Sequence, residues 1–158
     1  MIKLRPIKVK TDPMNLRKTE RAVRAAMDDA KDFALGRFRK TTATWEHAVD
    51  FTATATREGY IIGTDDPIYG YVDDGTSPHV IAAKPGKMLA FSVGGRAKTQ
   101  PGVIGSGAGA RGDTRVFAKV VQHPGTAPRG FTEIIGREAE VELSFGINAA
   151  LAGSVGGD

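Results

Sequence analysis

Apolar residues recur every three or four positions in two long stretches of this chain. The first stretch covers residues 14 to about 38, and charged residues fill the positions between the apolar ones. Such spacing places apolar side chains on one face of a helix and charged side chains on the other. The second stretch covers residues 131 to about 150. We therefore predict a long N-terminal helix and a C-terminal helix.

Between these stretches the chain changes to short runs of residues that favour β-strands. The runs are 49–57, 60–63, 79–82, 88–91 and 114–122. Their alternation and their β-branched residues predict strands. We expect the first two runs to form a meander, and the third and fourth to form a hairpin across residues 84–87. The predicted fold class is α+β, with a mostly antiparallel sheet of about five strands packed by the two helices.

The remaining segments predict an arm, a cap and a loop within a single domain of residues 1–158. Residues 1–12 alternate apolar and basic side chains, which indicates an N-terminal arm or edge strand whose lysines protect the edge or contact nucleic acid. Asp65, Asp66 and Pro67 are typical of a helix start, so a short helical turn is expected after them. Residues 94–113 are rich in glycine and are expected to form a flexible loop that becomes ordered on assembly. Residues 151–158 are expected to fray.

Composition and charge narrow the class of protein only slightly. The chain has 158 residues, 41% of them hydrophobic and 25% charged, which is typical of a globular protein. Its net charge of +4 fits contact with a polyanion and equally fits an ordinary surface. It contains no cysteine, which excludes disulfides and thiolate chemistry. Because no apolar run suits a signal peptide or a membrane span, we expect neither classical export nor membrane insertion.

Two short turn motifs are the most distinctive features of the sequence. Residues 73–78 read DDGTSP and are followed by His79, and residues 123–129 read HPGTAPR. Glycine, proline and aspartate each favour turns for a different physical reason. We therefore predict tight corners, with Asp74, Gly75, Thr76 and His79 in the first and His123, Pro124, Gly125 and Thr126 in the second. The two histidines are interpreted as turn locks whose rings bond to the main chain.

A tyrosine-rich segment leading into GT-x-PH-x-I-x-x-K, a Leu-x-Phe strand and the later HPGT-x-PR-x-F motif resemble the phage tail-component family. Members of that family lie at the head-tail neck of long-tailed double-stranded-DNA phages. The similarity covers residues 14 to about 150 in element order, and the two short motifs carry nearly all of its specificity. Residues 94–113 are longer and richer in glycine than the family pattern, so nothing specific to that segment is carried over.

The resemblance implies a structural virion protein with no catalytic step, no cofactor and no metal. Such a protein joins or completes the tail as part of an oligomeric ring around the DNA channel. Sixfold symmetry is favoured, with twelvefold as the alternative. The implied partners are further copies of the chain, neighbouring neck, tail-terminator or head-completion proteins, and passing double-stranded DNA bound without sequence specificity. The implied location is the virion neck, after assembly in the host cytoplasm.

Two other function classes remain open at this stage. A metal-dependent enzyme associated with nucleic acid would use His79 and His123 with Asp73 and Asp74, if the fold brings the two turns together. A monomeric DNA-binding module would use basic residues among the glycines; the candidate partner or DNA-channel contacts are Arg96, Lys98, Arg111 and Arg115. Residues 107–112 match the nucleotide-binding pattern G-x-G-x-x-G, but a strand rather than a helix is expected to follow, which argues against that use.

Overall fold

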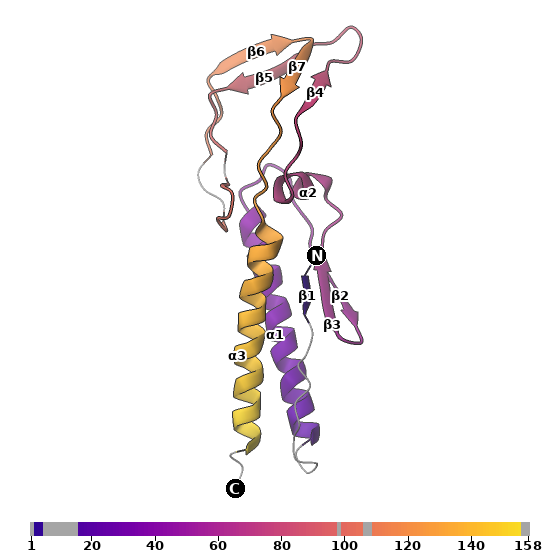
Figure 1. Ribbon diagram of the computed structural model, residues 1–158, viewed down its shortest axis with the longest axis vertical. Coiled ribbons are helices and arrows are strands. Elements are labelled where there is room, and N and C mark those ends of the chain that lie inside the picture. Colours follow the sequence, from indigo (N-terminus) through magenta and orange to yellow (C-terminus); the bar gives the residue numbers. More distant parts are fainter. Residues whose placement is uncertain (1, 5–15, 98, 106–108, 156–158) are drawn as a thin grey trace. The chain divides into compact units, whose positions relative to one another are not determined.

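The computed structural model describes residues 2–4, 16–97, 99–105 and 109–155 (Figure 1). Three helices and several short strands follow one another in the order β1 (Ile2–Leu4), α1 (Leu16–Thr42), β2 (Thr52–Thr56), β3 (Gly59–Gly63), α2 (Pro67–Asp73), β4 (His79–Ala82), β5 (Leu89–Val93), β6 (Thr114–Ala118), β7 (Val120–His123) and α3 (Phe131–Val155). The predicted α+β class is confirmed, as are the long N-terminal and C-terminal helices. The helix signals were readable because both helices carry apolar residues at helical spacing.

The chain forms two compact units. Unit 1 comprises Met1–Lys40, Val49–Asp65 and Thr132–Asp158, and unit 2 comprises Thr41–Ala48 and Asp66–Phe131. Unit 1 therefore holds most of both long helices together with β1, β2 and β3. Unit 2 holds α2 and the remaining strands.

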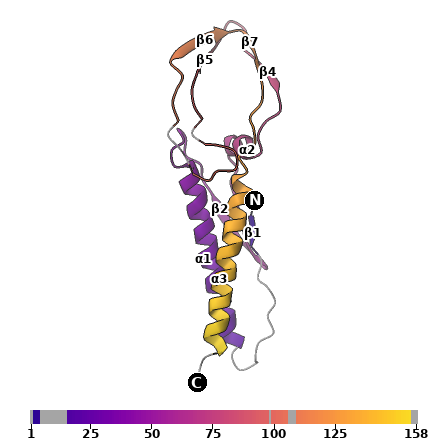
Figure 2. The same cartoon turned by 60° about the vertical axis from the view of Figure 1, so that its left-hand side comes forward.

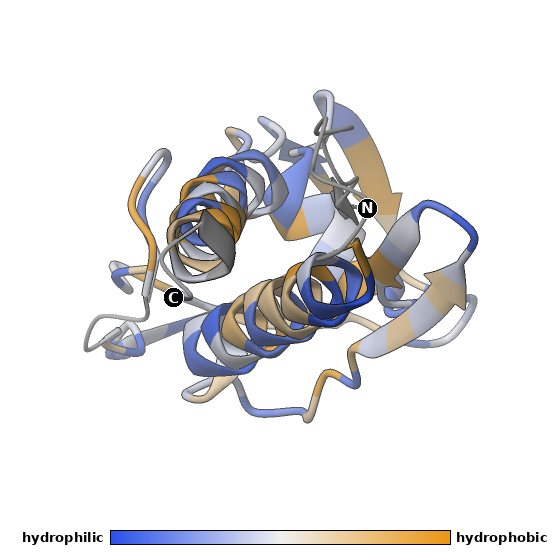
Figure 3. Ribbon diagram, turned by 90° about the horizontal axis from the view of Figure 1, so that it is seen from below, coloured by the Kyte–Doolittle hydropathy of each residue, from blue (hydrophilic) through white to orange (hydrophobic). Residues whose placement is uncertain are grey.

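The core of unit 1 lies where α1 and α3 pack antiparallel. Near one end of the pair, Lys18 Nζ donates a hydrogen bond to Gly153 O at 3.2 Å. Towards the other end, the Arg37 guanidinium binds both carboxylate oxygens of Glu138, at 2.7 Å and 2.8 Å. Apolar residues spaced four apart on α3 are buried, namely Ile135, Ala139, Leu143 and Ile147. Apolar and polar residues are interspersed along both helices, as the hydropathy colouring of Figure 3 shows.

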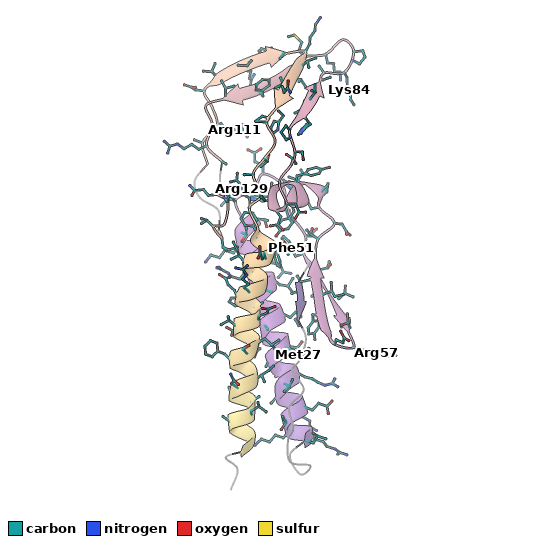
Figure 4. All side chains as sticks on the ribbon, in the orientation of Figure 1. Met27, Phe51, Arg57, Lys84, Arg111 and Arg129 are labelled. Atoms are coloured by element: carbon teal, nitrogen blue, oxygen red, sulfur yellow. The ribbon has the colours of Figure 1, made fainter. Side chains whose placement is uncertain are left out.

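A three-stranded antiparallel sheet completes unit 1, in the order β1, β3, β2. The predicted meander of β2 and β3 is confirmed, with Thr56 opposite Gly59 at its turn, where Arg57 is labelled in Figure 4. Ile62 of β3 is fully buried, and Phe51, just before β2, stacks on Phe38 of α1 with ring centroids 4.8 Å apart. The N-terminal arm is described only at β1, which pairs as an edge strand with β3. Its residues 5–12 lie outside the described residues.

A polar contact joins the same sheet to α1. Tyr60 of β3 donates a hydrogen bond to Asp28 Oδ1 at 2.5 Å, and Lys31 Nζ lies 3.1 Å from the same oxygen and 4.9 Å from the Tyr60 ring centroid. The hydrogen bond from Tyr60 and then that from Lys31 lower the pKa of Asp28. The same contact with Asp28 raises the pKa of Lys31 and that of Tyr60. The charged form of Asp28 is thus the one that this contact favours.

The prediction of one sheet of about five strands is wrong. Outside the β1–β3–β2 sheet, the described strands form two separate two-stranded sheets, β4 with β7 and β5 with β6. The expected hairpin of residues 79–82 with 88–91 is also wrong, because each of these strands pairs with a strand from later in the chain. The run 114–122 is divided at Lys119, and each half takes a different partner. A single broad sheet needs a buried face, yet β4 exposes all four of its residues.

In unit 2 these two sheets continue one another as a bent two-stranded ribbon. Ala83 N–H donates to Lys119 O at 2.8 Å, which links the β4–β7 ladder to the bend between β6 and β7. Beyond β5 and β6 the strands close again at the Arg96–Ala110 bridge. The ribbon bends over and its far end returns to the base of unit 2, as Figure 2 shows, where Gly102 N–H donates to Arg129 O at 2.9 Å. We call residues 79–123 the β-arm.

Among the described residues, no helix combines the length and the apolar content that crossing a membrane requires.

Candidate functional site

The two sequence motifs lie side by side at the base of the β-arm. Thr76 N–H donates to Thr126 O at 2.9 Å, and Thr126 N–H donates to Thr76 O at 3.0 Å, so the two threonines form a reciprocal antiparallel bridge. Three residues after Thr76 and three residues before Thr126, His79 stands opposite His123 at the end of the β4–β7 ladder nearest this bridge. The fold therefore brings the two turns together, which was the condition for any joint use of the two histidines.

Each turn contains a glycine that no other residue can replace without strain. Gly75 has φ of 75° and Gly125 has φ of 86°, in the left-handed region that favours glycine. A methyl group on Gly75 would stand 2.8 Å from Pro128 N and closer still to Thr126 O. A methyl group on Gly125 would overlap Thr76 O and stand 3.0 Å from the Ser77 carbonyl carbon. Each glycine thus makes room for the threonine carbonyl of the opposite turn.

The centroids of the two histidine rings are 5.0 Å apart. The His79 ring donates a hydrogen bond to the main chain, whereas the His123 ring accepts one. His79 Nδ1 lies 2.9 Å from Ser77 O, so Nδ1 donates and the free lone pair of the neutral ring is on Nε2. His123 Nδ1 accepts from Gly125 N–H at 3.1 Å, so the proton of the neutral ring is on Nε2. Both hydrogen bonds are of the kind that the turn-lock interpretation requires. Whether the rings contribute stability stays a prediction.

The acidic residues of the first motif serve the end of α2. Asp74 is the C-cap, and its N–H donates to Gly70 O at 2.9 Å. Asp73 is buried, and its carbonyl accepts from Arg129 N–H at 3.0 Å and Gly130 N–H at 3.1 Å. Over the described residues, no group of three or more histidine, cysteine, aspartate or glutamate side chains is arranged to hold a metal ion. In the described part of the chain, His79 and His123 therefore come together without carboxylates arranged beside them as metal ligands.

Arg129 connects three parts of the base. Its N–H donates to Val72 O and Asp73 O, at 3.1 Å and 3.0 Å, while its carbonyl holds Gly102 of the returning segment. The Arg129 side chain is labelled in Figure 4. Its Nε and the Thr76 hydroxyl are buried, and neither atom finds a hydrogen-bond partner among the described residues.

An aromatic cluster supports α2 beneath the paired turns. Asp66 caps the helix, accepting from Tyr69 N–H at 2.8 Å, which confirms the helix start expected at Asp65-Asp66-Pro67. Tyr69 is 5% exposed, and its ring centroid lies 6.1 Å from that of Trp45 and 6.5 Å from that of Phe131. His47 Nε2 lies 3.2 Å from Asp66 Oδ2, an ion-pair distance that lacks the geometry of a hydrogen bond.

The predicted basic contacts occupy different places on the β-arm. Arg96 is exposed at the bridge to Ala110, and Arg115 is exposed in β6 opposite Ser92. Arg111 binds Glu46 at 2.7 Å, with both side chains exposed, and this contact raises the pKa of Arg111. Lys98 lies outside the described residues, as do residues 107 and 108 of the glycine pattern. In the described part of 94–113, Thr99 is buried; the mobility expected of this segment stays a prediction.

Large apolar side chains remain exposed on the β-arm, which sequence reasoning did not identify. They are Val80, Ile81, Met88, Phe91, Val93, Val103, Phe117 and Val120. A two-stranded ribbon cannot bury apolar residues on both of its faces, and an isolated one is only marginally stable in water. Clusters of exposed apolar residues mark interaction surfaces more often than scattered single residues do.

Comparison of the chain with protein-family models, with curated proteins and with solved structures finds no match.

Proposed function

We propose that this chain is a structural virion protein of the phage head-tail neck, which joins or completes the tail as part of an oligomeric ring around the DNA channel. The observation that carries the proposal is the pairing of the two motifs on which the family resemblance rests. Gly75-Thr76 and Gly125-Thr126 bond to one another at the base of the β-arm. The two motifs therefore form one structural unit, which holds the base of the β-arm together.

The arm itself supports a role within an assembly. It presents exposed apolar residues, including Phe117 at 58% and Val120 at 60% exposure. Such side chains are costly in water and gain when a partner covers them. A sixfold ring is the favoured arrangement and a twelvefold ring the alternative. The other partners are neighbouring neck, tail-terminator or head-completion proteins, and the site of action is the virion after assembly in the host cytoplasm.

Electron microscopy and mass measurement of the purified protein test this proposal. The expected result is closed ring particles whose mass corresponds to six or twelve copies, alone or with a neighbouring neck protein. A protein that remains monomeric in every mixture with neck proteins of the same phage, and that is missing from purified virions, contradicts the proposal.

One observation favours a second candidate, a monomeric DNA-binding module. The described part of the β-arm carries basic residues against the single acid Asp113; they are Lys84, Lys87, Arg96, Arg111, Arg115 and Lys119. Such a module predicts DNA affinity that falls steeply with salt. The enzyme alternative predicts a metal-dependent activity that is lost on substitution of His79 or His123. A ring protein that only lets DNA pass requires neither result.

A further inference from the structure

The most exposed aromatic side chain of the β-arm stands between two cations. Phe117 lies in β6, and alternation along a strand places Arg115 on the same face. Lys119 follows two residues after Phe117, at the bend beyond the end of β6. The residue opposite Phe117 is Ala90, which is too small to cover the ring. Neither Arg115 nor Lys119 forms an ion pair within the described part of the chain. We call Arg115, Phe117 and Lys119 the arm face.

Helix α3 carries a surface of opposite charge and similar apolar content. Val141 is 55% exposed and Phe145 is 69% exposed, and these residues lie one helical turn apart on the same face. Glu142 lies three residues before Phe145 on the same side of α3, and Glu140 precedes Val141 in the sequence. Within the described residues no ion pair involves either glutamate, whereas Arg137, four residues before Val141, is paired with Glu133. The opposite face of α3 is already buried in unit 1 through Ile135, Ala139, Leu143 and Ile147. We call Glu140, Val141, Glu142 and Phe145 the α3 face.

We propose that the arm face of one copy docks on the α3 face of a second copy, an inference that rests on the ring assembly proposed above. An aromatic residue between two cations meets an aromatic and aliphatic pair beside two carboxylates. Apolar surface is buried at the centre and the opposite charges adjoin it, an arrangement typical of protein interfaces.

The occupant of the arm face is a protein surface rather than DNA because of Phe117. The phosphate backbone would neutralise Arg115 and Lys119, but it would leave the exposed phenyl ring in water. Double-stranded DNA offers no unstacked base on which that ring could stack. The α3 face supplies both the carboxylates and the apolar contact.

The contact joins two different surfaces, so an open chain of copies keeps one unused arm face at one end and one unused α3 face at the other until the assembly closes. Heterologous contacts of this sort generate a ring when the rotation closes and a filament when it does not. Docking of the arm face on the α3 face therefore accounts for a ring with one repeated contact.

Charge reversal with rescue tests the docking. We expect Arg115→Glu and Glu142→Lys each to weaken self-association roughly tenfold or more in sedimentation equilibrium. The double variant R115E/E142K places opposite charges together again and should restore the association to within about threefold of the parent. Arg57→Glu is the control, since it reverses an exposed charge in unit 1 outside both faces. Circular dichroism verifies that each variant is folded.

Cross-linking gives a second and independent measurement, because the chain has no native cysteine. Phe117→Cys and Phe145→Cys are placed in two copies of different mass, which are mixed and oxidised. The expected product is a disulfide-linked dimer with one copy of each kind. Thr54→Cys, at an exposed position of β2, replaces Phe145→Cys in the control and should give no such product.

These experiments distinguish failure of the docking proposal from failure of the ring proposal. A protein that associates normally in both single-reversal variants, or that cross-links only from Phe117→Cys to Phe117→Cys, overturns the docking and leaves the ring proposal in place. A disulfide that forms within a single chain carrying both Phe117→Cys and Phe145→Cys also overturns the docking. Loss of DNA binding in R115E with unchanged self-association assigns the arm face to DNA instead. A chain that is monomeric at all concentrations overturns the docking, and presence or absence in virions then decides the ring.

Discussion

Gly125 lies against the main chain of Thr76 so closely that no side chain fits between them. The converse contact, Gly75 against Thr126, gives the two turns a local twofold relationship. The tetrapeptides Gly-Thr-Ser-Pro at 75–78 and Gly-Thr-Ala-Pro at 125–128 differ at one position, and both are used in the same way. The base of the β-arm therefore depends on two glycines from segments that are far apart in the sequence.

Gly125→Ala should destabilise the protein by roughly 2 to 4 kcal/mol, because it adds a steric overlap with Thr76 O to the cost of positive φ. Gly86→Ala is the matched control. Gly86 also has positive φ, but nothing lies within 4 Å of a methyl group there. We expect Gly86→Ala to cost about 1 kcal/mol. Urea unfolding of both variants measures the difference, and equal losses would show that the close approach between the turns contributes nothing.

His123→Ala should cost about 1 kcal/mol of stability, because it removes the acceptor of the Gly125 N–H. Substitution of His79 or His123 by Asn or Gln should also lower the stability, and it should not abolish any catalytic activity. Thermal unfolding measures these losses. Metal analysis of the purified parent accompanies it, and a tight, stoichiometric divalent metal would contradict a structural role for the two rings.

The Asp28–Tyr60 hydrogen bond predicts a loss of stability in acid. The pKa of Asp28 is lowered in the folded state, so its contribution is present above the ordinary value of 3.8 and is lost as the pH falls through the folded-state pKa. Tyr60→Phe removes the strongest cause of this shift. The stability difference between parent and Tyr60→Phe should therefore be constant near neutral pH and shrink below pH 3.8. A difference that is the same at pH 7 and pH 2 would contradict the assignment.

Gly146→Ala should destabilise the helix pair even though alanine is the better helix former. A methyl group at Gly146 would stand 2.8 Å from the Ala26 Cβ, so α1 and α3 would have to move apart. Overpacking of this kind costs typically about 1 to 3 kcal/mol, which exceeds the helix-propensity gain of about 1 kcal/mol. Gly36→Ala, at an exposed position of α1 with no neighbour within 4 Å, should instead stabilise the protein. Denaturant midpoints of the two variants should shift in opposite directions; a stabilising Gly146→Ala would refute the close packing.

The sequence predicted the helices well because their signals are local. Spacing of apolar residues marked α1 and α3, and Asp66 with Pro67 marked the start of α2. Glycine is a poor helix former, yet α3 continues past Gly146 to Val155. The reason for glycine there is the approach of Ala26, which is a tertiary contact and leaves no local pattern.

Strand pairing was predicted poorly because it depends on partners distant in the sequence. Residues 79–82 and 88–91 have the spacing of a hairpin, but the bend at Lys119 gives each strand a separate partner. The repeated Gly-Thr-x-Pro tetrapeptide was the available signal that the two turns pair. Apolar residues such as Phe117 could not be recognised as exposed, because an alternating pattern does not tell whether its own chain or a partner covers the apolar face.

Cryo-electron microscopy of virions is the measurement that bears most directly on the neck assignment that we propose. We predict a ring at the head-tail neck into which this fold can be placed, with six or twelve copies around the DNA channel. Virions whose neck is fully accounted for by other proteins, with this chain undetectable in them by mass spectrometry, would contradict it.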